Sequence, residues 1–514
     1  MKRIFTVLAV TLLLTAAMAM TASASEYDSV AEDLSAIGVF RGTSSGFELD
    51  RAPTRSEAAI MLVRLYGAEE EAQTAYQAGD ITMPFTDVGT TAAPYVAWLY
   101  DQGITNGTSA TTFGTGACSA QNYVVFLLRA LGYQDGTDFA YGDALTFAQQ
   151  KGFYDPLQFA GTFLRDDLAA VTYQALGTDL KDGSAYLLES LIDSGAVDAT
   201  AAAPMTEQIE AYRALMAASA TMDSTALDAD LNASIDISYT QDGETVSMPI
   251  NMSGNMQMIL DESDLQMAYA FDMDILGESM TMSEWLQDGW VYVQTEIGDE
   301  TVRTKTQVNL EEQLALLEQL EGTASMAAVN ASGLAMVDSI TVATQGTDTV
   351  YTMVIREASM QSMLGSVLGL MGDLGLGAEE TTAMMDQLNF GDVTVVYTVD
   401  RNGNLTDVAM TFSMEMTIPA EEGGTPASMT ASYDMDMTVN ATGDSVRITF
   451  PDFSSFEEVI VPDLDTSENS RTVYVTQTGK RYHYDNSCNG GTYYESTLEE
   501  ALSRGLTPCE KCVL

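Results

Sequence analysis

The feature that most constrains the fold is an internal repeat with an offset of 65 residues. The segment from Leu34 to Gly42 aligns with the segment from Leu99 to Gly107, and both copies keep glycines at matched positions. A looser third copy runs from Ala148 to Gly177. Units repeated in this way stack on one another to bury a shared core. We therefore predict three helix–turn–helix units, which would make the first part of the chain all-α.

The second helix of the first unit has a clear start signal. Thr54 is a typical N-cap residue, and Glu57 follows three positions later, as a capping box requires. Apolar side chains then recur at helical spacing, at Ala58, Met61, Leu62 and Leu65. Helix capping alone could explain why Thr and Glu occur at a single helix start. It does not explain a threefold repeat with matched glycines.

These motifs resemble the S-layer homology (SLH) family across residues 25–203. The segment Thr54-Arg55-Ser56-Glu57 is similar to the family's Thr-Arg-Ala-Glu signature, and Phe85-Thr86-Asp87-Val88 is similar to its opening motif. The resemblance implies three modules, at about residues 25–68, 84–133 and 138–178, that form one helical prism. It also implies that grooves between the modules bind secondary cell-wall polysaccharide, which is often pyruvylated.

The same resemblance assigns roles to four residues. Arg55 would contact the anionic groups of the polymer, and Arg165 would do so in a second groove. Glu57 and Asp87 would shape the groove. These four side chains are therefore the predicted polymer-binding residues.

All three copies depart from the family pattern. The second copy has Cys118-Ser119-Ala120-Gln121 where the signature is expected, and the third has Leu164-Arg165-Asp166-Asp167. The first copy lacks a Phe-x-Asp-Val opening. Two interpretations remain open: modules that fold and bind the wall, and modules that keep the fold but bind it weakly.

Charge and composition exclude several functions. The chain has 514 residues, with 21 Lys and Arg against 74 Asp and Glu, which gives a net charge of −53. Binding to nucleic acid or to an anionic membrane surface depends on cationic side chains, so neither partner is expected. His483 is the only histidine, which excludes a catalytic zinc held by several histidines. Pairs of acids are inevitable among 74 and do not indicate a hydrolase. We expect a protein that is not an enzyme.

The N-terminus predicts export. Residues 1–24 combine a basic start, an apolar run and a final Ala22-Ser23-Ala24, which together are typical of a secretory signal peptide and its cleavage site. No second apolar stretch of about 20 residues follows, so we expect no transmembrane segment after cleavage. The predicted location is extracellular, at the cell wall or cell surface.

The middle of the chain, residues 204–460, has another composition. A run of small residues at 197–204 reads as a linker, and 25 of the 30 methionines lie between Met205 and Met437. Apolar and polar residues then alternate with period two, which predicts an antiparallel sheet with one buried and one wet face. A helix is expected from Thr206 to Met222, and further helices at Asn309–Leu320 and between Ala358 and Leu388.

This region resembles the lipoprotein-like half-barrel domains of Gram-positive bacteria, which are distantly similar to periplasmic lipoprotein carriers. The helix Ile209 to Met216 before a strand and the segment Trp285 to Gln294 carry the resemblance. It implies an α+β half-barrel with an apolar cavity for a lipid-like ligand, and a fully packed core without a cavity is the alternative. Methionine as core filler is favoured over copper binding, and a hairpin turn at Asp400–Asn404 over a calcium loop.

The tail carries the sharpest chemical signal. After a polar linker at 461–471, residues 472–514 contain three of the four cysteines and the only histidine. Their order is His483, Cys488, Cys509 and Cys512, and the last two form a Cys-x-x-Cys turn. Three thiolates and one imidazole complete a structural zinc site, which would stabilise a small α+β module. Disulfide pairing is the alternative in an exported protein.

The tail also resembles small Cys/His modules of exported bacterial proteins, with ligand spacing similar to the metal-binding domain of Ada-type repair proteins. A structural role for the metal is implied. Taken together, the sequence predicts a wall-anchored binding protein whose β domain takes a hydrophobic ligand. The alternative is a structural surface-layer or adhesion component without a ligand.

Overall fold

The structure is a computed structural model. It describes most of the chain from residue 27 to residue 459 and parts of the tail. The described residues are 27–156, 158–159, 161–221, 225–261, 264–275, 277–308, 333–356, 388–418, 427–459, 472–476, 480–485, 488, 493–498, 501, 506–509 and 511–512. The predicted signal peptide, the 461–471 linker and the expected helices at 309–320 and 358–387 lie outside these residues.

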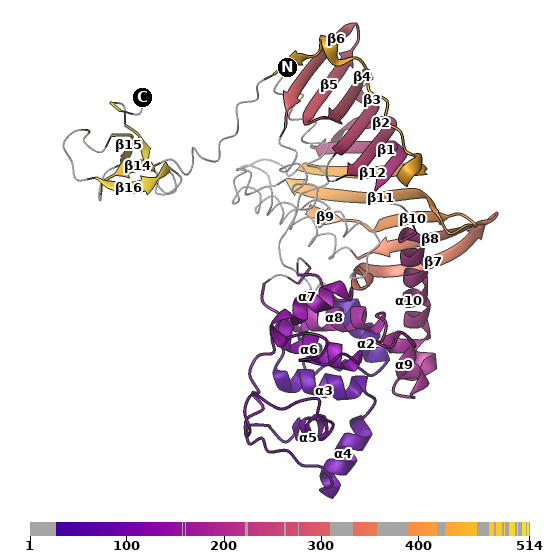
Figure 1. Cartoon of the computed structure of the whole chain (residues 1–514), viewed down its shortest axis with the longest axis vertical. Coiled ribbons are helices and arrows are strands. Elements are labelled where there is room, and N and C mark those ends of the chain that lie inside the picture. Colours follow the sequence, from indigo (N-terminus) through magenta and orange to yellow (C-terminus); the bar gives the residue numbers. More distant parts are fainter. Residues whose placement is uncertain are drawn as a thin grey trace.

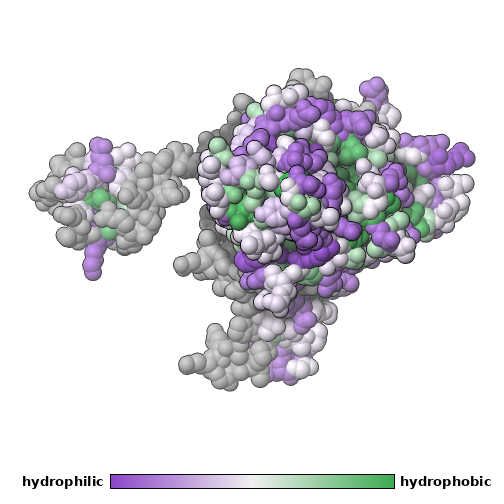
Figure 2. Space-filling model, turned by 90° about the horizontal axis from the view of Figure 1, so that it is seen from below, coloured by the Kyte–Doolittle hydropathy of each residue, from purple (hydrophilic) through white to green (hydrophobic). Residues whose placement is uncertain are grey.

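The first part of the chain is helical, as predicted (Figure 1). Short helices precede longer ones in each predicted repeat, and further helices follow the first and third repeats. The helices are α2 (Asp28–Ala36), α3 (Arg55–Leu65), α4 (Glu69–Ala78), α5 (Ala93–Asp101), α6 (Ala120–Ala130), α7 (Ala144–Gln150), α8 (Arg165–Leu176), α9 (Leu187–Asp193) and α10 (Ala199–Ser219). Figure 2 views this helical end, where hydrophilic residues cover most of the surface and hydrophobic residues form smaller patches.

The repeats interlock through the chain that leads into α3, α6 and α8. The Arg55 N–H donates to the Gly116 carbonyl at 2.9 Å, and the Cys118 N–H donates to the Pro53 carbonyl at 2.8 Å. In the same way, the Arg165 N–H donates to the Arg51 carbonyl at 2.9 Å. The entry segment of the first repeat is thus hydrogen-bonded to those of both other repeats.

The middle of the chain forms one large, mostly open antiparallel sheet. Its strands run in the order β13-β6-β5-β4-β3-β2-β1-β12-β11-β10-β8-β7, with β9 paired to β11. The strands are β1 (Ala226–Gln241), β2 (Glu244–Asp261), β3 (Asp264–Ile275), β4 (Glu278–Gln287), β5 (Trp290–Ile297), β6 (Glu300–Gln307), β7 (Val337–Gln345), β8 (Asp348–Ile355), β9 (Leu388–Phe390), β10 (Val393–Val399), β11 (Leu405–Ile418), β12 (Ala427–Thr442) and β13 (Glu457–Glu458). Among the described strands of this sheet, the short β13 alone pairs in parallel, with β6.

The predicted hairpin turns are confirmed. Asp242 and Gly243 both adopt positive φ, at 54° and 82°, and join β1 to β2 in a two-residue turn. In the second turn, the Asp400 carboxylate accepts the N–H groups of Asn402 and Asn404, at 2.8 and 2.9 Å. The Asp400 loop is therefore a hairpin between β10 and β11.

One face of the sheet is polar and carries a return segment of the chain. After β12, the chain crosses this face until β13 meets β6 at the edge (Figure 1). Phe453 stacks on Tyr292 with ring centroids 3.7 Å apart, and Phe456 packs edge-on against Trp285. The aromatic residues hold this return segment on the sheet.

The expected linker at 197–204 is wrong, because the helix α10 already begins at Ala199. Asp198 caps this helix by accepting the Ala201 N–H at 2.9 Å, and alanine-rich sequence favours helix. Pro204 lies in the second turn of this helix, where it removes one backbone hydrogen bond without ending the helix. A continuous helix therefore joins the helical region to the sheet.

The helical region and the sheet share one hydrophobic core at β7, β8 and β10. Arg356, 7% exposed, lies at this junction. Its Nε donates to the Ala335 carbonyl at 3.0 Å, and its Nη1 contacts Asp338 at 3.2 Å and the Ser29 hydroxyl. These contacts fix the sheet to the helices rather than leaving the two parts on a flexible joint.

The tail forms a second, four-stranded sheet in the order β16-β14-β15-β17. These strands are β14 (Thr472–Val475), β15 (Arg481–His483), β16 (Tyr494–Thr497) and β17 (Thr507–Pro508). A small apolar cluster supports it, formed by Val473, Val475, Tyr482, Leu498, Ala501 and Leu506. Within the described part of the chain, no helix is both long enough and apolar enough to span a membrane.

Candidate functional site

Arg165 and Glu57 form a buried contact between the third and first repeats. Arg165 is 4% exposed, and its Nη1 lies 3.1 Å from a Glu57 carboxylate oxygen. Its Nε donates to the Phe47 carbonyl at 2.8 Å, and its guanidinium lies over the Phe40 ring. Arg51 also pairs with Glu57, at 2.6 Å. Arg165 is thus neutralised by a carboxylate inside the fold.

Glu57 is held as an anion by its surroundings. Burial would raise the pKa of Glu57, but hydrogen bonds from Arg51 and from Thr54 lower it to about 2. The Thr54 backbone N–H donates to this carboxylate at 2.7 Å, which completes the predicted capping box. Glu57 therefore links a helix cap to two arginines.

Arg55 has a different environment from Arg165. Its Nη1 donates to the neutral Asn122 side chain at 3.0 Å, and its guanidinium lies 5.0 Å from the Phe113 ring centre. Among the ion pairs of the described residues, none includes Arg55. Its Nε is buried and has no hydrogen-bond partner there. Burial lowers the pKa of Arg55. Among the described residues, Arg55 is thus a cation without a countercharge.

Asp87 supports the loop beneath Arg55. Its two carboxylate oxygens accept the N–H groups of Phe113 and Gly114, each at 2.8 Å. These hydrogen bonds lower the pKa of Asp87. Asp87 therefore positions the Phe113 ring on which Arg55 lies, and Arg55 and Asp87 belong to one site. The polymer contacts of all four predicted residues stay a prediction.

The structure corrects the alignment of the second signature. The helix cap equivalent to Thr54 is Ser119, whose hydroxyl accepts the Asn122 N–H, so the signature occupies 119–122 and not 118–121. The 65-residue offset of the repeat already gives this result when it is applied to Thr54. Asn122, which holds Arg55, was missed for this reason.

The corrected alignment shows a cyclic rule. The first helical residue of one repeat reaches the third helical residue of the next: Arg165 contacts Glu57, and Arg55 contacts Asn122. By this rule the first helical residue of the second repeat should reach Asp167 of the third repeat. That residue is Ala120 and not an arginine. Burial raises the pKa of Asp167 to about 6, although the Leu164 N–H donates to its carboxylate at 2.6 Å. The third interface thus holds an acid whose expected arginine is missing.

The apolar face of the sheet is the second candidate site. Directly opposed residues share a face, and the register puts methionines of β2, β3, β4, β11 and β12 together on one side. The helical region covers this face at β8 and β10. Toward β4, many of its methionines are only half-buried. They include Met252, Met256, Met258, Met267, Met280, Met282, Met410, Met414, Met429, Met435 and Met437.

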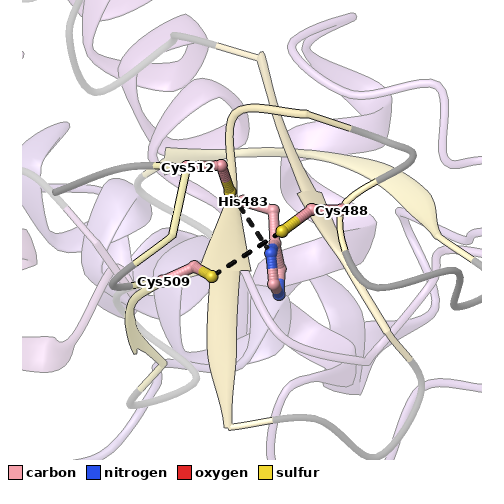
Figure 3. Close-up of side chains that lie close together, drawn as sticks. All are labelled: His483, Cys488, Cys509 and Cys512. Atoms are coloured by element: carbon pink, nitrogen blue, oxygen red, sulfur yellow. Dashed lines mark hydrogen bonds between the residues drawn. The ribbon is translucent and has the colours of Figure 1, made fainter.

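The tail brings its four predicted ligands together (Figure 3). The candidate ligand atoms of His483, Cys488, Cys509 and Cys512 all lie within 4.8 Å of one another. The Sγ atoms of Cys488 and Cys509 are 3.9 Å apart, and Cys512 Sγ lies 3.4 Å from His483 Nδ1. A tetrahedral zinc with bonds of about 2.3 Å to sulfur and 2.0 Å to nitrogen separates its ligands by about 3.8 Å and 3.5 Å. The cluster therefore fits a tetrahedral metal ion.

The cysteines of this cluster are free thiols. A disulfide would require a sulfur–sulfur distance of about 2.05 Å. A backbone N–H from Lys511 is the main cause that lowers the pKa of Cys509, and it favours the thiolate form that binds metals. The donor set and its spacing match a closed structural site with four protein ligands.

Two family models match the chain. A family of unknown function, DUF6612, matches residues 208–464, which is half of the chain. The S-layer homology domain matches residues 84–117, which include Asp87 and Phe113. The predicted order, an S-layer homology region followed by a large β domain, is confirmed. The chain has no match among curated proteins.

Three solved structures show weak likeness. A putative outer membrane lipoprotein-sorting protein domain from Vibrio parahaemolyticus is 7% identical, with 48% of this chain and 97% of that chain covered and a TM-score of 0.13. The ywiB protein from Bacillus subtilis is 8% identical, with 42% of this chain and 96% of that chain covered and a TM-score of 0.10. A DUF1329 family protein from Desulfovibrio piger is 8% identical, with 45% of this chain and 92% of that chain covered and a TM-score of 0.13. TM-scores this low do not establish a common fold.

Proposed function

This chain belongs to the DUF6612 family of unknown function, and we propose that it is an exported, non-enzymatic protein of the cell surface. Its S-layer homology module supports attachment to the cell wall. In this proposal the helical region binds secondary cell-wall polysaccharide, and the sheet binds a hydrophobic ligand on its methionine-rich face.

The observation that carries the anchoring proposal is the environment of Arg55. A pyruvylated polymer is anionic, and a guanidinium without a carboxylate partner is the kind of group that binds such a polymer. Arg55 meets this condition because Asn122 replaces an acid beside it. Arg165 does not, because Glu57 already neutralises it. The proposed contact therefore uses Arg55, with Asp87 holding the loop below it.

The test is the affinity of the full mature chain for purified secondary wall polymer. We expect Arg55→Gln to weaken binding about tenfold or more, as the loss of one charge-assisted contact of about 1.4 kcal/mol requires. Arg41→Gln is the matched control, because Arg41 is half-exposed and its Glu69 partner also has Arg64. Equal affinity of the Arg55 variant and the wild type would remove Arg55 from the site.

The ligand proposal rests on the half-buried methionines of the sheet. Soluble proteins rarely leave a contiguous apolar surface open, and flexible methionine side chains adapt to apolar ligands of varied shape. Organic extraction of the chain purified from its own cells, followed by mass spectrometry, tests this directly. We expect a stoichiometric apolar molecule. Native protein without one would favour a structural surface component.

We also propose that the tail cluster holds a structural zinc ion. Three thiolates and one imidazole match the preferred donors of zinc, and four protein ligands would leave no open position for catalysis. Elemental analysis should find one zinc per chain in the wild type and none in Cys509→Ser, with wall binding unchanged in the variant. Metal-free protein purified under reducing conditions would contradict a zinc site.

A further inference from the structure

A single carboxyl group interrupts the apolar face of the sheet. Glu284 lies on β4, directly opposite Tyr269 of β3 and Val293 of β5, and therefore on the same face as both. Its neighbours along the strand on this face are Met282 and Leu286. The acid thus stands among apolar side chains on β4, the outermost methionine-bearing strand on this side of the described sheet.

No described residue neutralises this carboxyl group. The described residues offer Glu284 neither a hydrogen bond nor an ion pair, and burial alone raises its pKa. The hydroxyl of Tyr269, its cross-strand neighbour, points to the sulfur atoms of Met258 and Met267, at 3.8 Å from each. Glu284 is therefore an acid on the apolar face that has no polar partner among the described residues of the sheet.

The rest of the β region does not supply a cation either. Arg303 and Lys305 of β6 oppose Gln294 and Tyr292, which places both on the polar face of the sheet. Arg356 is committed to Asp338 at the junction, and Arg447 donates to backbone carbonyls. The sequence segments 309–332, 357–387 and 419–426 contain no lysine, arginine or histidine. Arg401 lies exposed in the turn between β10 and β11. The described structure therefore places no cation of the β region beside Glu284, and we take its countercharge to come from another molecule.

We infer that the ligand of the methionine-rich face is an amphiphile with a cationic, amine-type head group that pairs with Glu284. Its apolar body would cover the methionines, and its ammonium group would supply the countercharge that covering an ionised carboxylate demands. This inference rests on the proposed function, because it names the chemistry of the hydrophobic ligand proposed above.

The experiment compares two probes of equal chain length, dodecylamine and dodecanoate, below their micelle concentrations and at neutral pH. Binding to the full mature chain is measured by calorimetry. We expect the wild type to bind the amine about tenfold more tightly than the acid, which corresponds to one favourable charge contact. Glu284→Gln should abolish this preference. Glu415→Gln is the matched control, because Glu415 lies exposed on the polar face of β11.

Each outcome separates the two proposals. A preference that is lost only in Glu284→Gln supports the amine head group. Equal binding of both probes by the wild type, or a preference that survives Glu284→Gln, overturns the head-group inference and leaves the apolar-ligand function standing. Failure of both probes to bind contradicts the apolar-ligand function itself.

Discussion

The helical region and the sheet bury their side chains to different extents. In the helices, large side chains such as Tyr123, Leu127 and Tyr173 are completely buried, and arginines meet acids or amides of the next repeat. In the sheet, methionines toward β4 are only half-buried, and Glu284 has no countercharge among the described residues. The difference indicates that the core of the helical region is closed by its own side chains, whereas much of the apolar face of the sheet stays partly exposed.

The difference in burial predicts that truncating a side chain lowers the unfolding free energy more in the helical region than on the methionine-rich face. Leu127→Ala removes a fully buried side chain and should cost about 2–5 kcal/mol of unfolding free energy. Met282→Ala removes a half-buried one and should cost about 1 kcal/mol or less. Chemical denaturation of both variants measures this. Equal costs would mean that the methionine-rich face is already filled, and the comparison would fail.

The third repeat interface, at Asp167, predicts a pH-dependent stability of the helical region. The folded pKa of Asp167 is about 6, above its ordinary 3.8, so the wild type loses stability as the pH rises from about 4 to about 6. The loss is on the order of 3 kcal/mol, at 1.36 kcal/mol per pKa unit. Asp167→Asn should remove this pH dependence, because the neutral amide still accepts the Leu164 N–H.

Ala120→Arg tests the same interface by restoring the missing arginine. The cyclic rule expects the new side chain to reach Asp167, to lower its pKa and to stabilise the protein at neutral pH. The wild type, Asp167→Asn and Ala120→Arg are compared by thermal unfolding at pH 4.5 and pH 7. If the difference between wild type and Asp167→Asn is the same at both pH values, Asp167 titrates normally. If Ala120→Arg is no more stable than the wild type at pH 7, the cyclic rule does not hold at this interface.

The junction offers a third test. Arg356→Met keeps an apolar stem of similar length but loses the contacts to Asp338 and the Ala335 carbonyl, so we expect a loss of about 2–3 kcal/mol. Hydrogen exchange should speed up in α2 and β7 together, because both elements meet at Arg356. Faster exchange in the sheet alone would show that the two parts are not coupled through this residue.

A further test concerns a close contact inside the sheet. A Cβ atom added at Gly254 would lie 2.0 Å from the Ala270 carbonyl oxygen and 2.5 Å from the Phe271 ring. Gly254→Ala should therefore cost about 1–3 kcal/mol through local displacement of β3. Gly277→Ala does not serve as its control, because Gly277 has a positive φ of 83°. Ala270→Ser, which adds one atom on the polar face of β3, is the better control and should be close to neutral.

The sequence predicted those features that depend on local chemistry. The capping box at Thr54, the turn at Asp242 and Gly243, and the period-two alternation each follow from a few neighbouring residues, and each is confirmed. The gathering of His483, Cys488, Cys509 and Cys512 was also predictable, because metal-ligand spacing is a short-range pattern.

Features that depend on contacts between distant segments could not be predicted. Arg55 and Arg165 look equivalent in sequence, and only the fold gives one of them Asn122 and the other Glu57. Alanine-rich sequence after Asp198 satisfied the pattern for a linker as well as for a helix. The isolation of Glu284 followed only from the register of β3, β4 and β5.

The most direct test of the central claim, attachment to the cell wall through the helical region, is a sedimentation assay. The full mature chain is mixed with native cell walls and with walls stripped of their secondary polymer, and the pelleted fraction is measured. The account predicts pelleting with native walls and release when the polymer is removed. A chain that stays in the supernatant with native walls, or that pellets equally with stripped walls, would contradict it.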